Sequence, residues 1–230
     1  MLLLAFFMIR AVIFDFNGIL ADDDPIHMQA FRRIAEEEGL GFHDEEYMDR
    51  YLPLNDHDCF AQLWHNNNRV LPGGELEELI RRKSIYYFRA IEQKEVLFEG
   101  AAEAVRAAAK RGHIGIASGA SIGEIRHILG TAGLLDCFST IVAAEDVKHG
   151  KPDPEPFRLA YERLKQHCAG LEPSECLAVE DSLGGIQSAQ SAGMPCLGIA
   201  HSYSRDRLEG AKASWVIESI SDFPKWLSTV

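Results

Sequence analysis

The first hydrophobic run of the chain ends abruptly at a carboxylate. Residues 11–14 (Ala-Val-Ile-Phe) are continuously apolar, Asp15 follows them, and Asn17-Gly18 turns the chain away. A continuous apolar run bounded by a turn signal is typical of a strand that is buried on both faces. We therefore predict a buried strand here, with Asp15 at its carboxyl end.

The pattern then becomes helical and stays so for a long stretch. Apolar residues recur at helical spacing, and no strand pattern interrupts them before about residue 99. The predicted helices span residues 25–39, 44–51, 56–66 and 74–93. A block of helices between two strands is an insertion, so we predict a helical domain over residues 23–95.

From residue 100 onwards helices and strands alternate. Helices are predicted at 100–111, 121–132, 154–167 and 183–192, and strands at 114–118, 140–144, 176–179 and 195–200. A short helix and the run 213–217 complete the chain. Strands that alternate with helices of this length imply right-handed crossovers and a parallel sheet. We predict an α/β fold in which residues 1–22 and 96–230 form a doubly wound, Rossmann-like core.

Composition narrows the range of partners. The 230 residues are 47% hydrophobic and 25% charged, and 35 acids against 23 bases give a formal charge of −12. Such an acidic protein is a poor electrostatic partner for nucleic acid or anionic lipid. We expect no nucleic acid and no membrane partner, and a phosphate-bearing substrate would need locally concentrated positive charge.

The five cysteines are scattered and show no Cys-x-x-Cys spacing. This pattern favours reduced thiols and a cytoplasmic location. The apolar segment 1–9 has no basic leader and is too short to span a bilayer, so it is not predicted to be a signal peptide or a membrane span. It is either a tail or an extension of the first strand.

Chemically capable residues follow the first four predicted core strands. In chain order they are Asp15 and Asn17, Ser118 and Gly119, Lys151, and Glu180 and Asp181. The carboxyl ends of parallel strands converge on one crevice, where open α/β sheets bind ligands. Each residue alone could be a helix cap or an ordinary loop residue, but four such groups in order point to one site.

These residue types suit phosphoryl chemistry. Asp15 and Asp181 can share a hard divalent cation such as Mg²⁺. Ser118 and the backbone N–H groups after it can bind phosphate oxygens, and Lys151 can neutralise anionic charge. Asp15 itself can act as a nucleophile, as carboxylates do in aspartyl-phosphate enzymes.

The motifs resemble those of the haloacid dehalogenase superfamily, in the branch of β-phosphoglucomutase-like and phosphatase-like proteins that carry a helical cap. They read Asp15-Phe-Asn-Gly-Ile-Leu, Ala117-Ser-Gly-Ala-Ser, Gly150-Lys-Pro-Asp-Pro and Glu180-Asp-Ser-Leu-Gly-Gly. The resemblance implies a five-stranded parallel sheet, with the helical insertion as a cap that closes over substrate.

The resemblance also implies roles for particular residues. Asp15 would be the nucleophile and a Mg²⁺ ligand, and the main-chain carbonyl of Asn17 and the carboxylate of Asp181 would be further ligands. Glu180 would lie at or near the metal, and Ser118, Gly119 and Lys151 would hold the phosphoryl group. In the cap, Lys83 matches a substrate-facing lysine and His27 matches a hinge histidine. A solvated helix face is the alternative for Lys83, and a half-buried helix position is the alternative for His27.

The sequence departs from the family at residue 17, where phosphatases and mutases carry an Asp that serves as general acid and base. Asn cannot ionise in the working pH range, and losing such a group typically costs ~10²–10⁴-fold in rate. Three explanations stay open: a trapping substitution, a protein that is naturally slow or only binds, or replacement by another group. Asp23 is the candidate for that replacement, although it could simply favour the helix start at Pro25.

A second departure lies at Asp56, where the sugar-phosphate mutases carry an arginine that grips a remote phosphate. An acid cannot do this, so phosphatase ranks above phosphomutase. We predict a Mg²⁺-dependent phosphatase that acts on a small phosphorylated metabolite through an aspartyl-phosphate on Asp15, as a monomer or weak homodimer. The alternatives are a catalytically crippled phosphoryl-binding protein and, below it, a metal-independent haloacid dehalogenase.

Overall fold

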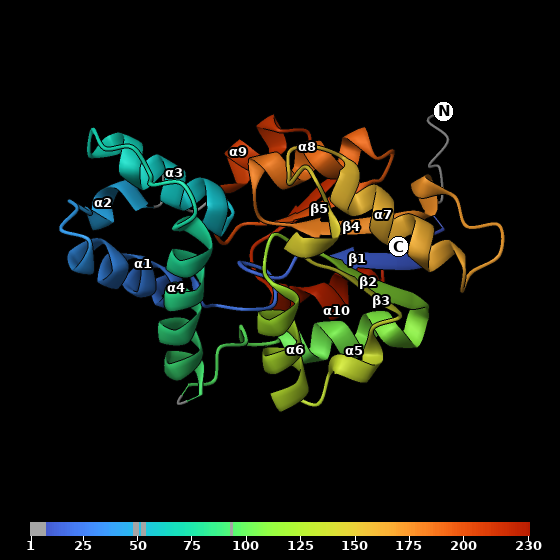
Figure 1. The fold of residues 1–230 in the computed structure, drawn as a ribbon. Helices are drawn as coiled ribbons and strands as arrows, with labels where there is room; N and C mark the ends of the chain where they lie inside the picture. The colour runs from blue at the N-terminus through green and yellow to red at the C-terminus, as the bar shows by residue number, and fades with distance from the viewer. Residues whose placement is uncertain (1–7, 48–50, 52–53, 93) are drawn as a thin grey trace. The chain divides into compact units, whose positions relative to one another are not determined.

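The computed structural model describes residues 8–47, 51, 54–92 and 94–230 of the chain (Figure 1). The chain divides into two compact units. The core unit combines Met1–Asp22 with Leu97–Val230, and the helical unit is Asp23–Val96. Residues 1–7 of the apolar opening segment, for which a tail or a strand extension was expected, and residues 48–50 of the helix expected at 44–51 lie outside the described residues.

The core unit contains a parallel sheet with the strand order β3-β2-β1-β4-β5-β6. The strands are β1 (Ala11–Phe14), β2 (His113–Ala117), β3 (Thr140–Val142), β4 (Cys176–Glu180), β5 (Cys196–Ile199) and β6 (Trp215–Ile217). The chain builds outward from β1 to β3 and then returns to place β4 on the other side of β1. The predicted doubly wound fold is confirmed, and its topological switch point lies between β1 and β4, where such sheets bind ligands.

The sheet has one strand more than the five that were expected. The additional strand, β6, pairs in parallel with β5 at the edge of the sheet, with Leu197 opposite Trp215. All three of its residues are half-buried. A three-residue strand with uniform partial burial shows neither a long apolar run nor clear alternation, so the sequence pattern did not identify it.

Helices cover both faces of the sheet, as an all-parallel sheet requires. In Figure 1, α5, α6 and α10 lie on one face and α7, α8 and α9 on the other. These helices are α5 (Ala101–Arg111), α6 (Ile122–Thr131), α7 (Glu155–Lys165), α8 (Leu183–Ser191), α9 (Arg205–Gly210) and α10 (Phe223–Leu227). Ile13 of β1 and Ala178 of β4 pack with Phe157 and Leu164 of α7 in one buried cluster. This packing fixes the central strands, and they in turn position the loops that follow their carboxyl ends.

The helical unit contains α1 (Asp24–Glu37), α2 (Asp44–Glu46), α3 (Asp56–Asn66) and α4 (Leu76–Ile91). Its own core joins Phe31 and Ile34 of α1 to Phe60, Leu63 and Trp64 of α3. The amphipathic spacing that predicted α1, α3 and α4 therefore also gives each of them a buried face. Of the helices in the described part of the chain, none combines the length and apolar character needed to cross a membrane.

Candidate active site

Three carboxylates meet at the switch point of the sheet. Phe14 of β1 pairs with Val179 of β4, so the next residues, Asp15 and Glu180, stand side by side at the carboxyl ends of neighbouring strands. Asp181 follows directly, and one oxygen from each of the three acids lies within 4.8 Å of the others. Glu180 is fully buried and Asp181 is 4% exposed. The sheet register therefore assembles an oxygen-rich, largely buried cluster.

Lys151 joins two of these acids. Its Nζ lies 2.8 Å from Asp15 Oδ1 and 2.5 Å from Glu180 Oε1. The lysine comes from the loop between β3 and α7, and its ammonium also lies 5.0 Å from the ring centroid of Phe157. The structure thus brings Lys151 to the acids that the sequence analysis assigned to the same site.

Burial and charge shift the protonation of this group. Burial raises the pKa of Asp15 from 3.8 to about 7, the Glu180 carboxylate adds to the rise, and Lys151 and the Phe16 N–H oppose it. Burial would lower the pKa of Lys151, but Asp15 and Glu180 outweigh it and the pKa is raised. Lys151 is therefore charged at neutral pH, whereas Asp15 is poised between its two forms.

The donor set fits a divalent cation such as Mg²⁺. With the acids ionised, three carboxylates and one ammonium carry a formal charge of −2 in a largely buried space. A hard dication prefers oxygen ligands and would neutralise this excess. It would also favour the ionised form of Asp15.

Two glycines allow the cluster to pack tightly. A Cβ on Gly185 would lie 1.9 Å from the carboxyl carbon of Glu180, and Ser182 donates from both its N–H and its hydroxyl to Glu180 Oε2 at 3.2 and 2.9 Å. A Cβ on Gly18 would lie 2.2 Å from Asp181 Oδ2, and Gly18 has a φ of +75°. Glycine is required at position 18 by both its conformation and its closeness to the acid.

The loop after β2 provides a candidate phosphate cradle. Ser118 is 2% exposed, and its Oγ accepts a hydrogen bond from the Ala120 N–H at 3.0 Å. Ser121 caps α6 in a reciprocal pair with Glu124. These bonds occupy the Ala120 and Ser121 N–H groups, whereas among the hydrogen bonds of the described residues none uses the N–H of Gly119. The exposed Gly119 can therefore offer its N–H to an anion at the start of a helix.

Asn17 lies in the tight turn that follows Asp15 and is half-buried. The Leu20 and Ala21 N–H groups donate to Phe16 O at 2.8 and 2.9 Å, and the Gly18 N–H donates to Ala21 O at 2.9 Å. The turn thus has its own hydrogen bonds, and these do not depend on whether residue 17 can ionise. The chemistry of residue 17 is separable from the geometry of its turn.

Lys83 and His27, which the sequence analysis assigned to an expected cap, meet within the helical unit. Lys83 Nζ lies 2.6 Å from His27 Nδ1 and 2.8 Å from Asp56 Oδ1. The His27 ring stacks on Tyr87, whose hydroxyl donates to Asp23, and His27 Nε2 lies 3.3 Å from Asp23 Oδ2. Lys83 is completely buried, so the alternative of a solvated helix face is wrong.

Two functional candidates escaped the sequence analysis. His201 and Ser202 follow β5, and they contact Gly18 and Asp181 respectively. They belong to no motif that we recognised. Their only signal is their position at the carboxyl end of a predicted parallel strand, where side chains converge on the crevice.

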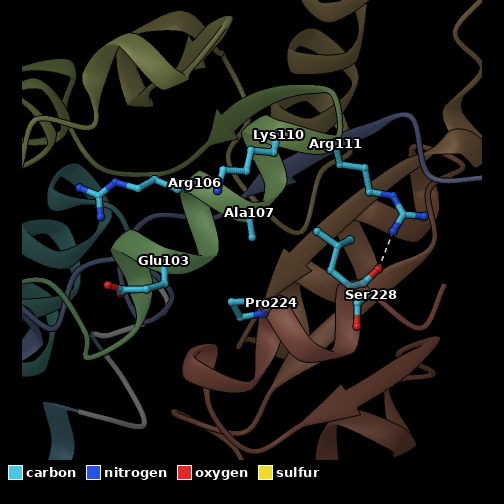
Figure 2. Close-up of a pocket in the computed structure, with 8 residues that line it drawn as sticks. Glu103, Arg106, Ala107, Lys110, Arg111, Pro224 and Ser228 are labelled. Carbon is cyan, nitrogen blue, oxygen red and sulfur yellow. Dashed lines mark hydrogen bonds between the residues drawn. The ribbon is translucent and has the colours of Figure 1, made fainter.

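A groove elsewhere in the core unit is separate from this site. It has a volume of about 610 Å³ and lies between α5 and α10, where Arg111 donates to the carbonyl of Leu227 (Figure 2). Its lining residues are Glu103, Arg106, Ala107, Lys110, Arg111, Pro224, Leu227 and Ser228. None of them belongs to the acid cluster, so the groove carries none of the chemistry described above.

Comparison with known proteins gives consistent relatives. The profile of the haloacid dehalogenase-like hydrolases matches residues 9–193. The chain is 30% identical to a phosphorylated carbohydrates phosphatase of Thermotoga maritima over 204 residues, which cover 84% of this chain and 86% of that protein. It is also 30% identical to a phosphoglycolate phosphatase of Yersinia pseudotuberculosis, over 85% of this chain and 83% of that protein.

A solved structure extends the likeness to the fold. A variant of CbbY from Rhodobacter sphaeroides in complex with xylulose-(1,5)bisphosphate superposes with a TM-score of 0.82 and 25% identity. The match covers 94% of this chain and 96% of that one.

Proposed function

This chain belongs to the haloacid dehalogenase-like hydrolase family, as its motifs predicted, and we propose that it is a Mg²⁺-dependent phosphatase of a small phosphorylated metabolite. The observation that carries the proposal is the pairing of Asp15 with Lys151 beside Glu180 and Asp181 at the switch point of the sheet. Relatives named as phosphatases of phosphorylated carbohydrates and of phosphoglycolate favour small, anionic substrates.

In the proposed reaction Asp15 attacks phosphorus. A bond forms between an Asp15 carboxylate oxygen and phosphorus, and the ester P–O bond breaks to release the alkoxide, which must gain a proton. Lys151 neutralises charge on the transferring group, and Ser118 with the Gly119 N–H holds its oxygens. A bound Mg²⁺ would supply further positive charge, held by Asp15, Asp181 and the Asn17 carbonyl, with Glu180 at or near it.

In the second step water attacks the aspartyl-phosphate. A bond forms between the water oxygen and phosphorus, the bond to Asp15 breaks, and the water loses a proton. Asn17 can neither donate the first proton nor accept the second. Without a replacement group, both steps depend on solvent. A good leaving group avoids the penalty on the first step, but hydrolysis of the aspartyl-phosphate is slow for every substrate.

The helical unit is proposed to act as the cap that selects substrate and excludes water during the first step. His27 and Lys83 would bind the part of the substrate that does not react. The contact between them supports a joint role, because the Lys83 ammonium and the His27 imidazole lie only 2.6 Å apart and can bind the same polar part of a substrate. Asp56 beside them disfavours a second phosphate, and this supports a phosphatase over a phosphomutase.

The decisive experiment compares the parent with Asn17→Asp and Asp15→Asn. Turnover of p-nitrophenyl phosphate, phosphoglycolate and a panel of sugar phosphates is measured with and without Mg²⁺. Asn17→Asp should raise turnover of the alkyl phosphates by ~10²–10⁴-fold, whereas Asp15→Asn should abolish it.

Other outcomes would redirect the assignment. Equal rates for the parent and Asn17→Asp would mean that another group, such as Asp23, performs the proton transfers. Binding of inorganic phosphate by both without turnover of any ester would identify a phosphoryl-binding protein. Halide release from a haloacid without metal would identify a dehalogenase.

A further inference from the structure

Two consecutive residues after β5 connect the loops that follow β1 and β4. His201 Nδ1 lies 2.8 Å from the carbonyl oxygen of Gly18. The hydroxyl of Ser202 donates a hydrogen bond to Asp181 Oδ2. One dipeptide therefore contacts both the turn that contains Asn17 and the carboxylate of Asp181.

The chemistry of the acceptor shows which ring nitrogen of His201 carries a hydrogen. A carbonyl oxygen can only accept, so the Nδ1 atom of His201 must carry a hydrogen. The ring is also stacked on Phe98, with centroids 4.4 Å apart and planes 25° apart. The N–H of Phe98 in turn donates to Leu20 O at 3.0 Å. His201 is thus oriented by the same turn that it contacts.

The turn that contains Asn17 and Gly18 packs tightly against the Asp181 carboxylate. Gly18 lies so close to Asp181 that a Cβ would approach Oδ2 to 2.2 Å. His201 contacts the carbonyl of Gly18, and Ser202 donates to Asp181 Oδ2, the same oxygen that lies closest to Gly18. The separation between the Asn17 main chain and the Asp181 carboxylate therefore depends on both residues after β5.

We infer that His201 and Ser202 are positioning residues for the cation site. They hold the Asn17 turn and the Asp181 carboxylate at the spacing that a divalent cation requires. The inference rests on the proposed Mg²⁺ site, and it assigns to these residues the orientation of ligands, not contact with the ion or with substrate. Residues that orient metal ligands typically change metal affinity about 10–100-fold when they are replaced.

The positioning role does not require His201 to titrate. The neutral Nδ1–H tautomer and the imidazolium both donate from Nδ1, so the contact with Gly18 persists in either form. An Asn side chain can present its amide N–H near the position of Nδ1 but has no second nitrogen that could move a proton. His201→Asn therefore separates positioning from proton transfer.

The test measures Mg²⁺ affinity by calorimetry and the melting temperature of the metal-free protein for each variant. His201→Leu and Ser202→Ala should each weaken Mg²⁺ binding about 10–100-fold, whereas His201→Asn and Ser202→Thr should bind close to the parent. His113→Leu is the matched control, because it removes a ring that contacts Ser139 at 3.0 Å elsewhere in the core unit. It should leave the affinity unchanged.

Each contrary result has a distinct meaning. If Asp181→Asn abolishes binding but His201→Leu and Ser202→Ala bind as the parent does, the inference is wrong and the proposed cation site stands. If the parent binds no Mg²⁺, or Asp181→Asn binds as well as the parent, the cation site fails and the inference fails with it. If His201→Leu and His201→Asn both retain Mg²⁺ but lose turnover, His201 moves a proton and its positioning role is overturned.

Discussion

Lys151 holds its ammonium nitrogen 2.8 Å from Asp15 Oδ1, so the group that would neutralise a phosphate already pairs with the proposed nucleophile. The same nitrogen lies 2.5 Å from the fully buried Glu180 carboxylate. The lysine is therefore both a structural counter-ion and a candidate catalytic group.

Replacing this lysine should affect stability as well as turnover. Lys151→Met leaves two buried carboxylates without their cation, and breaking a buried pair in this way costs about 3–5 kcal/mol. We expect the free energy of unfolding to fall by that order at pH 8, as measured by urea titration in the presence of a chelator. Lys165→Met, on the exposed face of α7, should change it by only about 0.5 kcal/mol or less. A loss no larger than that of the control would show that the pair contributes little.

The metal-free protein should lose stability as pH rises towards neutrality. Folding raises the pKa of Asp15 from 3.8 to about 7, mainly by burial, so the folded state favours the protonated acid. The stabilisation from this proton is complete below about pH 4 and is lost as pH rises through 7. Asp15→Asn removes the titration, so its melting temperature should exceed that of the parent by a margin that grows between pH 5 and pH 8.

Differential scanning calorimetry in chelator measures this margin, with Asp206→Asn at an exposed position of α9 as the control. A margin that stays constant across the range would contradict the raised pKa of Asp15.

Gly18→Ala should disturb the cation site beyond the ordinary strain of a left-handed residue. A non-glycine residue at positive φ costs roughly 1–2 kcal/mol, and at Gly18 the added Cβ would also meet Asp181 Oδ2 at 2.2 Å. Gly39→Ala is the matched control, because Gly39 has a φ of +63° but no atom within 4 Å of its Cβ position.

Both variants should melt earlier than the parent, and only Gly18→Ala should lose Mg²⁺ affinity in calorimetry. Equal affinities in the two variants would show that the Asp181 carboxylate moves aside without cost.

Within the ion pair of Lys83 and Asp56, substitution of the two residues should have unequal effects on stability. The side chain of Lys83 is 1% exposed and that of Asp56 is 29% exposed. Asp56→Ala removes the carboxylate that pairs with the buried Lys83 ammonium, and we expect the free energy of unfolding to fall by on the order of 2 kcal/mol. Lys83→Met keeps the volume and leaves a carboxylate that water can reach, so the loss should be about 1 kcal/mol. Urea titration of the two variants checks the order, and the reverse order would mean that Lys83 does not depend on Asp56.

Much of the fold could be predicted because its signals are local. Helix α3 occupies the predicted range 56–66, and the ends of α4 differ from the predicted range 74–93 by two residues each. The strand expected at 140–144 ends at Val142, because Ala144 begins a 3₁₀ turn in which Asp146 accepts from the Ala143 N–H. The hydrophobic pattern does not reveal a turn of this kind, because it is stabilised by a polar side chain that bonds to the backbone three residues earlier.

The parts of the site that could not be predicted depend on contacts between distant segments. Lys83 lies among charged residues in the sequence, and only the fold brings it to His27 and Asp56, where it is buried. His201 and Ser202 act through a carbonyl and a carboxylate from two other loops. Neither residue type nor local spacing encodes such contacts. The acids, in contrast, each end a recognisable strand, and so the order of strands was enough to bring them together.

The pairing of β1 with β2 and β4 determines when this strand can reach its final place during synthesis. Ala11 pairs with His113 on one side and with Cys176 on the other. During synthesis β1 emerges before both of its neighbours, because β2 follows only after the whole helical unit and β4 only after the β2–β3 segment as well. At a synthesis rate of about 5–20 residues per second, residues 11–14 therefore remain without their final partner strands for several seconds. Asp15, the proposed nucleophile, is thus made well before Glu180 and Asp181, and a nascent chain that stops before β4 contains no acid cluster.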